Sequence, residues 1–160
     1  MKQTQFDKHT IAWFRIAECV SRGEKERALG VYRLLSHSFN DNAVARQLEA
    51  DIHLSFGEQE LAIPLYQQAM ESYQKSQRFL EAVAVCEHLI AMHSADVIWR
   101  REAIKLYKML DNTSKMQAHT ETVLDTLLVT GHDHVLQEFM SMLSALSDEL
   151  YEYAIEYIKK

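Results

Sequence analysis

The chain has 160 residues, which is the size of one domain with a sizeable core, and its net charge is −6. Four glycines and one proline are too few for a fold of many turns, and good helix formers are common, so the composition predicts an all-α protein. The charge excludes nucleic acid as a main ligand, because residues 116–158 hold eight acids and no Lys or Arg, whereas phosphate binding needs clustered cations.

Apolar residues recur at spacings of three and four along nearly the whole chain, and this spacing predicts helices. Polar or glycine-containing clusters separate the helical stretches. The predicted helices occupy residues 7–21, 24–38, 43–55, 58–76, 79–93, 97–110, 114–129, 133–145 and 148–160. Because the loops between them are short, we expect neighbouring helices to run antiparallel.

Several residues mark where these helices begin and end. Candidates for an N-cap or for an acid in the first turn are Asp96, Ser114, Asp133 and Asp148. Gly131 suits a left-handed C-cap. Pro64 lies several residues inside its predicted helix, where it removes a backbone hydrogen bond, and we expect it to kink the helix without breaking it.

Two stretches of the chain read almost alike: "RGEKERALGVYRLL" at 22–35 and "FGEQELAIPLYQQA" at 56–69. Gly23 matches Gly57, and Tyr32 matches Tyr66. A small residue lets two helix axes approach closely, and an aromatic ring one turn later fills the space between hairpins. The residues predicted to pack in this way are Ala28, Tyr32, Ala50, Ala62, Tyr66, Ala82, Ala103 and Tyr107.

A helix, a turn and a second helix that repeat at the interval from Gly23 to Gly57 resemble the tetratricopeptide repeat superfamily. The pattern around Ala62 then returns at Ala82 and again at Ala103, which are shorter intervals than the one from Ala28 to Ala62. Helix 58–76 would therefore serve two successive repeats, as in SNAP-type adaptors. The resemblance implies one domain, 1–160, built as an α-solenoid of about eight or nine helices. Its clear repeats span 12–93, its divergent helices span 97–145, and a capping helix spans 148–160.

The resemblance also implies a function, because in tetratricopeptide arrays the first helices of successive hairpins line a concave groove that holds a peptide. Carried onto this chain, the groove residues are Trp13, Ala17, Val20, Gln47, Asp51, Leu54, Gln67, Glu71 and Gln74. These are apolar, amide or acidic, unlike the lysines and asparagines with which co-chaperones of this family grip a carboxylate. We therefore expect a non-enzymatic adaptor or scaffold that binds a neutral or basic protein segment, with Asp51 or Glu71 meeting Lys or Arg.

Sequence signatures of catalysis are lacking: the chain has no glycine-rich phosphate loop, G-x-S-x-G, C-x-x-C or H-E-x-x-H. "GHDHV" places His132, Asp133 and His134 at a helix start, where they form either a divalent-metal site of a hydrolase or a surface cap. Alternate residues there point in different directions, which favours the cap. We expect no enzymatic activity, metal or cofactor.

Two cysteines, Cys19 and Cys86, lie in apolar-periodic segments, so we expect buried free thiols in a reducing compartment. Charged residues interrupt the N-terminal run early, and no run approaches the roughly 18 apolar residues of a membrane span, which predicts a cytoplasmic protein without a membrane partner.

Two alternatives to the adaptor remain. One is a homo-oligomer that pairs through helix 148–160 or through "FMSML" at 139–143, which otherwise fills the core. The other is a small secretion-type tetratricopeptide chaperone. The acidic C-terminal third either attracts a basic partner or only keeps the surface solvated.

Overall fold

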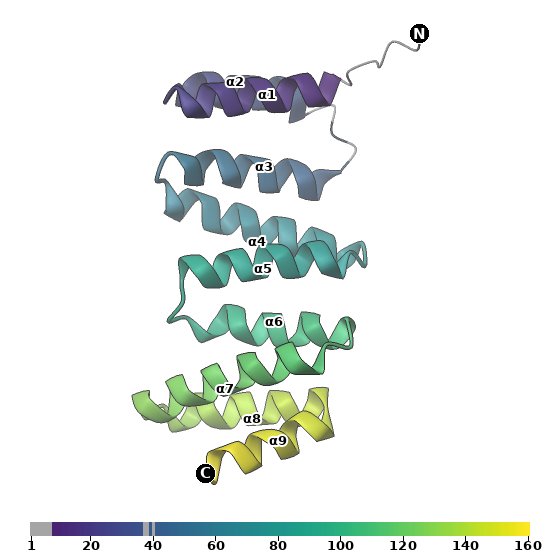
Figure 1. The fold of residues 1–160 in the computed structure, drawn as a ribbon, viewed down its shortest axis with the longest axis vertical. Helices are drawn as coiled ribbons and strands as arrows, with labels where there is room; N and C mark the ends of the chain where they lie inside the picture. The colour runs from purple at the N-terminus through teal and green to yellow at the C-terminus, as the bar shows by residue number, and fades with distance from the viewer. Residues whose placement is uncertain (1–7, 37–38, 40) are drawn as a thin grey trace. The chain divides into compact units, whose positions relative to one another are not determined.

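The structure is a computed structural model that describes residues 8–36, 39 and 41–160, without the side chains of residues 8–10 and 12. Nine helices and no strands occur in this part of the chain, so the all-α prediction is confirmed (Figure 1). The helices are α1 (Lys8–Ser21), α2 (Lys25–Ser36), α3 (Asn42–Ser55), α4 (Gln59–Lys75), α5 (Phe79–Met92), α6 (Val97–Met109), α7 (Thr113–Thr130), α8 (Asp133–Leu146) and α9 (Asp148–Ile158).

The chain divides into two compact units, residues 1–76 and 77–160. The first holds α1–α4 and the second holds α5–α9. Consecutive helices pack as neighbours within each unit, as a helical repeat requires. The prediction that the chain is one domain stays a prediction.

The helix boundaries agree with the predicted ones to within two residues, except that residues 7 and 37–38 of the first two predicted helices lie outside the described residues. Asp96 caps α6 by accepting a hydrogen bond from the backbone N–H of Ile98. Gly131 adopts the left-handed conformation that ends α7, with φ 69°. Ser114 is not a cap, because Asn112 takes that role by accepting from the N–H of Lys115.

The other start and stop signals are placed as follows. Asp133 and Asp148 lie in the first turns of α8 and α9, and the cap of α9 is Ser147. Helix α4 continues through Pro64, so the prediction that it does not break is confirmed, while the kink stays a prediction. Gly23 has φ 72°, a left-handed backbone that favours glycine and reverses the chain between α1 and α2.

The core of the first unit forms where α1, α2 and α3 meet. It contains Ile16, Cys19, Ala28, Leu29, Tyr32, Leu48 and Ile52. Ala28, Ala50 and Ala62 are fully buried, which allows their helices to approach closely. Cys19 is a buried free thiol, as predicted.

In the second unit, α6 packs between α5 and α7, and α9 packs against both α7 and α8. The largest fully buried side chains include Leu89, Ile104, Leu106, Leu124, Phe139 and Leu143. Phe139 and Leu143 belong to "FMSML" and fill the core, whereas Met140 and Met142 are half-buried and Ser141 is exposed. The alternative that this segment pairs with a second copy stays a prediction. Cys86 is the second buried free thiol.

Candidate functional site

Tyrosine side chains of the first unit join neighbouring helices through their hydroxyl groups. Each ring is buried, and each hydroxyl donates a hydrogen bond to a polar side chain of α3. The pairs are Tyr32 with Glu49, Tyr66 with Asp51, and Tyr73 with Gln47. Burial and the carboxylate partner raise the pKa of Tyr32 to about 12, and the same two causes raise the pKa of Tyr66. These bonds join α3 to α2 through Tyr32 and to α4 through Tyr66 and Tyr73.

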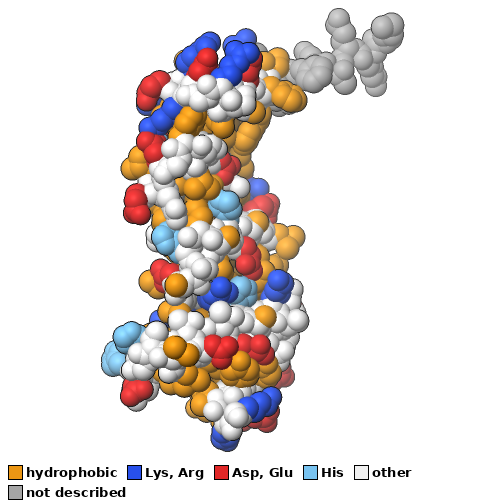
Figure 2. All heavy atoms as spheres, turned by 60° about the vertical axis from the view of Figure 1, so that its left-hand side comes forward, with side chains coloured by type: hydrophobic (Ala, Val, Ile, Leu, Met, Phe, Trp, Pro, Cys, Tyr) orange, Lys and Arg blue, Asp and Glu red, His pale blue; other side chains and the backbone are white. Residues whose placement is uncertain are grey.

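A groove of about 230 Å³ runs between α1 and α3. Its lining residues are Trp13, Ile16, Ala17 and Val20 from α1 and Leu48, Asp51, Ile52 and Ser55 from α3. The structure thus brings together four of the nine predicted groove residues, namely Trp13, Ala17, Val20 and Asp51. Figure 2 shows hydrophobic side chains at the surface around α1 and α2, interspersed with charged ones.

The groove has a buried apolar floor and a more exposed wall. Ile16, Leu48 and Ile52 are buried, whereas Trp13 keeps 41% of its surface exposed. Ala17 is exposed and has no side-chain atoms beyond Cβ, so its part of the groove stays open. A partly exposed tryptophan beside an apolar floor is typical of the anchor points of protein interfaces.

Asp51 is the one charged residue among the described residues that line the groove. Its Oδ1 accepts the hydrogen bond from Tyr66, which holds the carboxylate in a fixed orientation. The Ser55 hydroxyl donates to the backbone carbonyl of Asp51 at 2.7 Å and so stays close to its own helix. The groove therefore offers apolar surface together with one oriented negative charge.

Five predicted groove residues do not line this groove. Gln47 is half-buried and accepts the bond from Tyr73 at 2.9 Å. Gln67 and Glu71 are exposed on α4 and bond to each other at 3.2 Å. The reason is the orientation of α4, which buries Tyr66, Met70 and Tyr73 and so turns the row Gln67, Glu71 and Gln74 to another side. Leu54 is half-buried outside the groove.

A polar cluster in the second unit joins α5, α6 and α7. Glu87 Oε1 lies 2.9 Å from His119 Nε2 and accepts a hydrogen bond from the Tyr107 hydroxyl at 2.7 Å. Arg100 lies 3.5 Å from His119 Nδ1. Because a guanidinium only donates, this contact places the imidazole proton on Nε2, where it is donated to Glu87. This cluster was not predicted from the sequence.

The imidazole of this cluster is buried and the carboxylate is partly exposed. His119 is 7% exposed and its ring stacks on Tyr107. Burial raises the pKa of the Glu87 carboxyl, but the bonds from Tyr107 and His119 outweigh it and hold that pKa below its usual range. Burial also raises the pKa of the adjacent Cys86 thiol to about 12, so this group is not a nucleophile at neutral pH.

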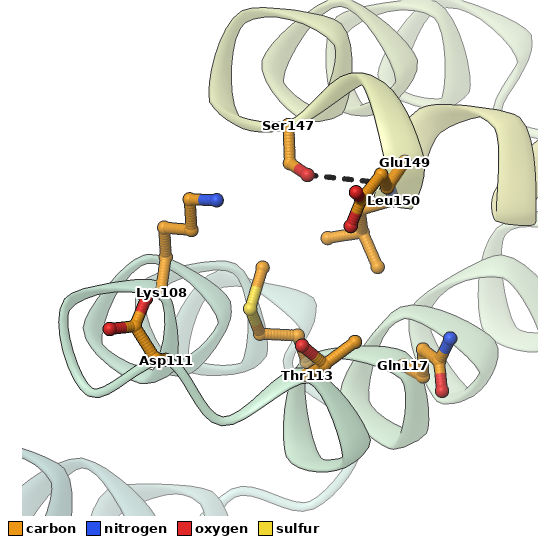
Figure 3. A pocket seen from close by; sticks show the side chains of 8 residues that line it. Lys108, Asp111, Thr113, Gln117, Ser147, Glu149 and Leu150 are labelled. Atoms are coloured by element: carbon orange, nitrogen blue, oxygen red, sulfur yellow. Dashed lines mark hydrogen bonds between the residues drawn. The ribbon is translucent and has the colours of Figure 1, made fainter.

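A second, polar pocket of about 240 Å³ lies in the second unit, where the ends of α6, α7 and α9 meet (Figure 3). Its lining residues are Lys108, Asp111, Thr113, Met116, Gln117, Ser147, Glu149 and Leu150. The Ser147 hydroxyl accepts from the N–H of Leu150, so it acts as a helix cap. With two acids and one lysine, the pocket has no consistent charge that would select a ligand.

The "GHDHV" segment forms the start of α8. His132 is the residue before the helix, and His134 lies 3.5 Å from Glu138 on the exposed surface. Within the described residues, no three His, Cys, Asp or Glu side chains lie close enough to bind one metal ion. None of the helices in the same residues combines the length and the apolar character that a membrane crossing requires.

Comparison with protein-family models, with curated proteins and with solved structures finds no match to this chain. The function must therefore be inferred from the groove, the polar clusters and the helical arrangement themselves.

Proposed function

We propose that the protein is a non-enzymatic adaptor that binds a segment of a partner protein in the groove between α1 and α3. The observation that carries this proposal is the groove itself, with its buried floor, the partly exposed Trp13 and the oriented Asp51. Its resemblance to the tetratricopeptide superfamily and the consecutive packing of the helices support the same function.

The size of the groove favours a polypeptide over a small molecule. Small-molecule sites enclose about 300–1,000 Å³ and bury most of their ligand. The groove measures about 230 Å³. Such a volume suits one or two apolar side chains of a segment whose remainder lies along the surface of α1 and α3.

The polar clusters of the second unit favour the same conclusion. The carboxylate of Glu87 and the imidazole of His119 bond to each other, and neither lines a cavity described above. General acid–base catalysis needs such groups within hydrogen-bonding distance of a substrate. The buried Cys86 does not meet the requirements of a reactive thiol.

A displayed library of random peptides tests the proposal. The library is selected on the immobilised full-length chain, and enriched peptides are titrated by fluorescence anisotropy. Ala17→Arg places a long side chain in the groove, and it is compatible with folding because Ala17 is exposed. Ala84→Arg is the matched control, since Ala84 is exposed on α5 in the other unit.

We expect the enriched peptides to bind the wild type and Ala84→Arg alike, and to bind Ala17→Arg about tenfold more weakly or not at all. Circular dichroism must show that both variants stay helical. If every enriched peptide binds Ala17→Arg as it binds the wild type, the groove is not the binding site and the proposal is wrong.

Self-association is the second candidate, because two large apolar residues of the first hairpin are open to solvent. Phe14 is 67% exposed and Leu34 is 83% exposed. Sedimentation equilibrium distinguishes the two functions. A monomer at the highest soluble concentration removes self-association, and a dimer that Phe14→Glu dissociates would favour it.

A further inference from the structure

We propose that the groove selects segments in which an apolar side chain lies within one helical turn of a lysine or arginine, and that Asp51 is the residue that makes this selection. This inference rests on the proposed function, because it names the partner chemistry of the same groove. It assigns unequal roles to Asp51 and Glu71, which the sequence treats as equivalent candidates.

The charge of the groove favours a basic partner. Among its described lining residues, Asp51 carries the one charge and there is no cation. Arg15 on α1 is two residues from both Trp13 and Ala17, so it lies roughly 200° around the helix from them and faces away from the groove. A segment with an acid at this place would bring two carboxylates together, whereas a cation would meet an opposite charge.

Three cations of the neighbouring surface pair with acids of their own. Arg22 lies 2.6 Å from Glu18, and Lys25 is bonded to Glu58. Arg46 lies 3.3 Å from Glu49. These pairs reduce the positive charge of the surface around the groove.

The carboxylate of Asp51 lies beside the apolar floor of the groove. Leu48 is buried in that floor and lies three residues before Asp51 on α3. Residues at this spacing share one side of a helix, with about 5–6 Å between their Cβ atoms. A partner whose apolar side chain enters the floor beside Leu48 therefore meets Asp51 with a cation that lies close to that side chain. The exposed ring of Trp13 adds a surface on which a cation can stack.

Asp51→Asn separates charge from structure. The asparagine side-chain oxygen can still accept the hydrogen bond from Tyr66, so the orientation of residue 51 and the fold are preserved. Glu71→Gln removes one negative charge from α4, where the side chain is exposed and lies outside the groove. It is the matched control for the loss of charge.

The experiment uses one enriched peptide and its variants in which the basic residue is Lys, Gln or Glu. Fluorescence anisotropy measures binding to the full-length wild type, Asp51→Asn and Glu71→Gln. For the wild type, we expect the Gln peptide to bind about five- to tenfold more weakly than the Lys peptide, as for one partly screened charge pair, and the Glu peptide to bind still more weakly. For Asp51→Asn the preference for Lys over Gln disappears, and for Glu71→Gln it stays. Added salt reduces the preference in the wild type.

Two results would overturn the inference, and they are distinguishable. If enriched peptides require an open groove, as judged by Ala17→Arg, but show no Lys preference that depends on Asp51, the adaptor function stands and the selection rule is wrong. If Ala17→Arg leaves binding of every peptide unchanged, the proposed function and the inference fail together.

Discussion

Tyr66→Phe tests whether the tyrosine hydroxyls hold the first unit together. The ring of Tyr66 is 1% exposed, and its hydroxyl donates to Asp51 on the neighbouring helix. Phenylalanine keeps the ring and its packing and removes only the oxygen. Any change in stability therefore reports the hydrogen bond between α4 and α3.

The magnitude follows from the partner and its burial. A hydrogen bond to a charged group contributes about 1.5–3 kcal/mol, and a buried acceptor that loses its donor carries a desolvation penalty. Asp51 is half-buried, so the loss lies inside this range and not at its upper end. We expect the free energy of unfolding to fall by about 2 kcal/mol, and the urea midpoint by about 1 M.

The assay is urea unfolding followed by circular dichroism, with Tyr157→Phe as the matched deletion. Tyr157 makes the same kind of bond to Asp125, but at the surface of the second unit, where water can replace the lost donor. The loss should therefore be clearly smaller for Tyr157→Phe. Equal effects of the two variants, or an unchanged stability of Tyr66→Phe, would refute the reasoning that burial gives this bond its value.

Four further predictions concern buried or half-buried groups. Thr120 is fully buried and its hydroxyl has no hydrogen-bond partner among the described residues, so Thr120→Val should raise the free energy of unfolding by about 1 kcal/mol in urea melts. A thiol reagent should modify Cys19, which is slightly exposed, before the fully buried Cys86, and denaturant should make the two rates equal; mass spectrometry of the labelled peptides checks the order. The pKa of Glu87 is held below its ordinary 4.5, so the stability that this carboxylate contributes is complete above that pH and is lost as the pH falls through the folded-state pKa. Glu87→Gln should therefore reduce the fall in the free energy of unfolding between neutral and acid pH, as measured by urea melts. An equal fall in the variant would show that another group causes the loss of stability in acid. In alkali the group to follow is Tyr32, because its pKa is raised to about 12 in the folded protein. The stability that its protonated hydroxyl contributes is complete below pH 10 and is lost as the pH rises toward 12. Titrations of tyrosinate absorbance in native and unfolded protein check this shift.

Local signals were sufficient to predict the helices, because each depends on residues a few positions apart. The spacing of apolar residues set the helical stretches, and glycines at positive φ such as Gly23 and Gly131 set the turns. Ser114 shows the limit of such signals. Both Asn112 and Ser114 are good caps by type, and only the structure shows that Asn112 reaches the N–H of Lys115.

The candidate groove was only partly predictable, because it depends on which face each helix turns to its neighbour. Trp13, Ala17 and Val20 line one groove together with Asp51. Their side of α1 follows from a single apolar stripe that includes the buried Ile16 and Cys19. Helix α4 has apolar and aromatic residues over a wider arc, so its exposed row could not be chosen from periodicity. The bond from Tyr66 to Asp51 determines which side of α4 faces α3, and no local sequence pattern predicts this bond.

Long-range hydrogen bonds at a constant sequence interval occur in the second unit, where the sequence resemblance fades. Glu87 with His119, Glu121 with Tyr153, and Asp125 with Tyr157 are each separated by 32 residues. The first pair joins α5 to α7, and the other two join α7 to α9. Alternate helices of this unit are therefore bonded to each other at the same sequence interval. The two pairs between α7 and α9 advance together by four residues, which makes these helices parallel.

A constant offset of this kind also has a physical consequence for how the helices find their alignment. Apolar side chains at helical spacing allow two helices to slide by one turn and still bury similar surface. A carboxylate that meets a tyrosine or histidine at one alignment would lose its donor at any other. The loss costs about 1–3 kcal/mol where the carboxylate is buried, and less at the surface, where water replaces the donor. The apolar stripes therefore bring the helices together, and the polar pairs determine the alignment at which they stop. In the first unit the bond from Tyr66 has two effects: it fixes α4 on α3, and it orients Asp51 in the groove.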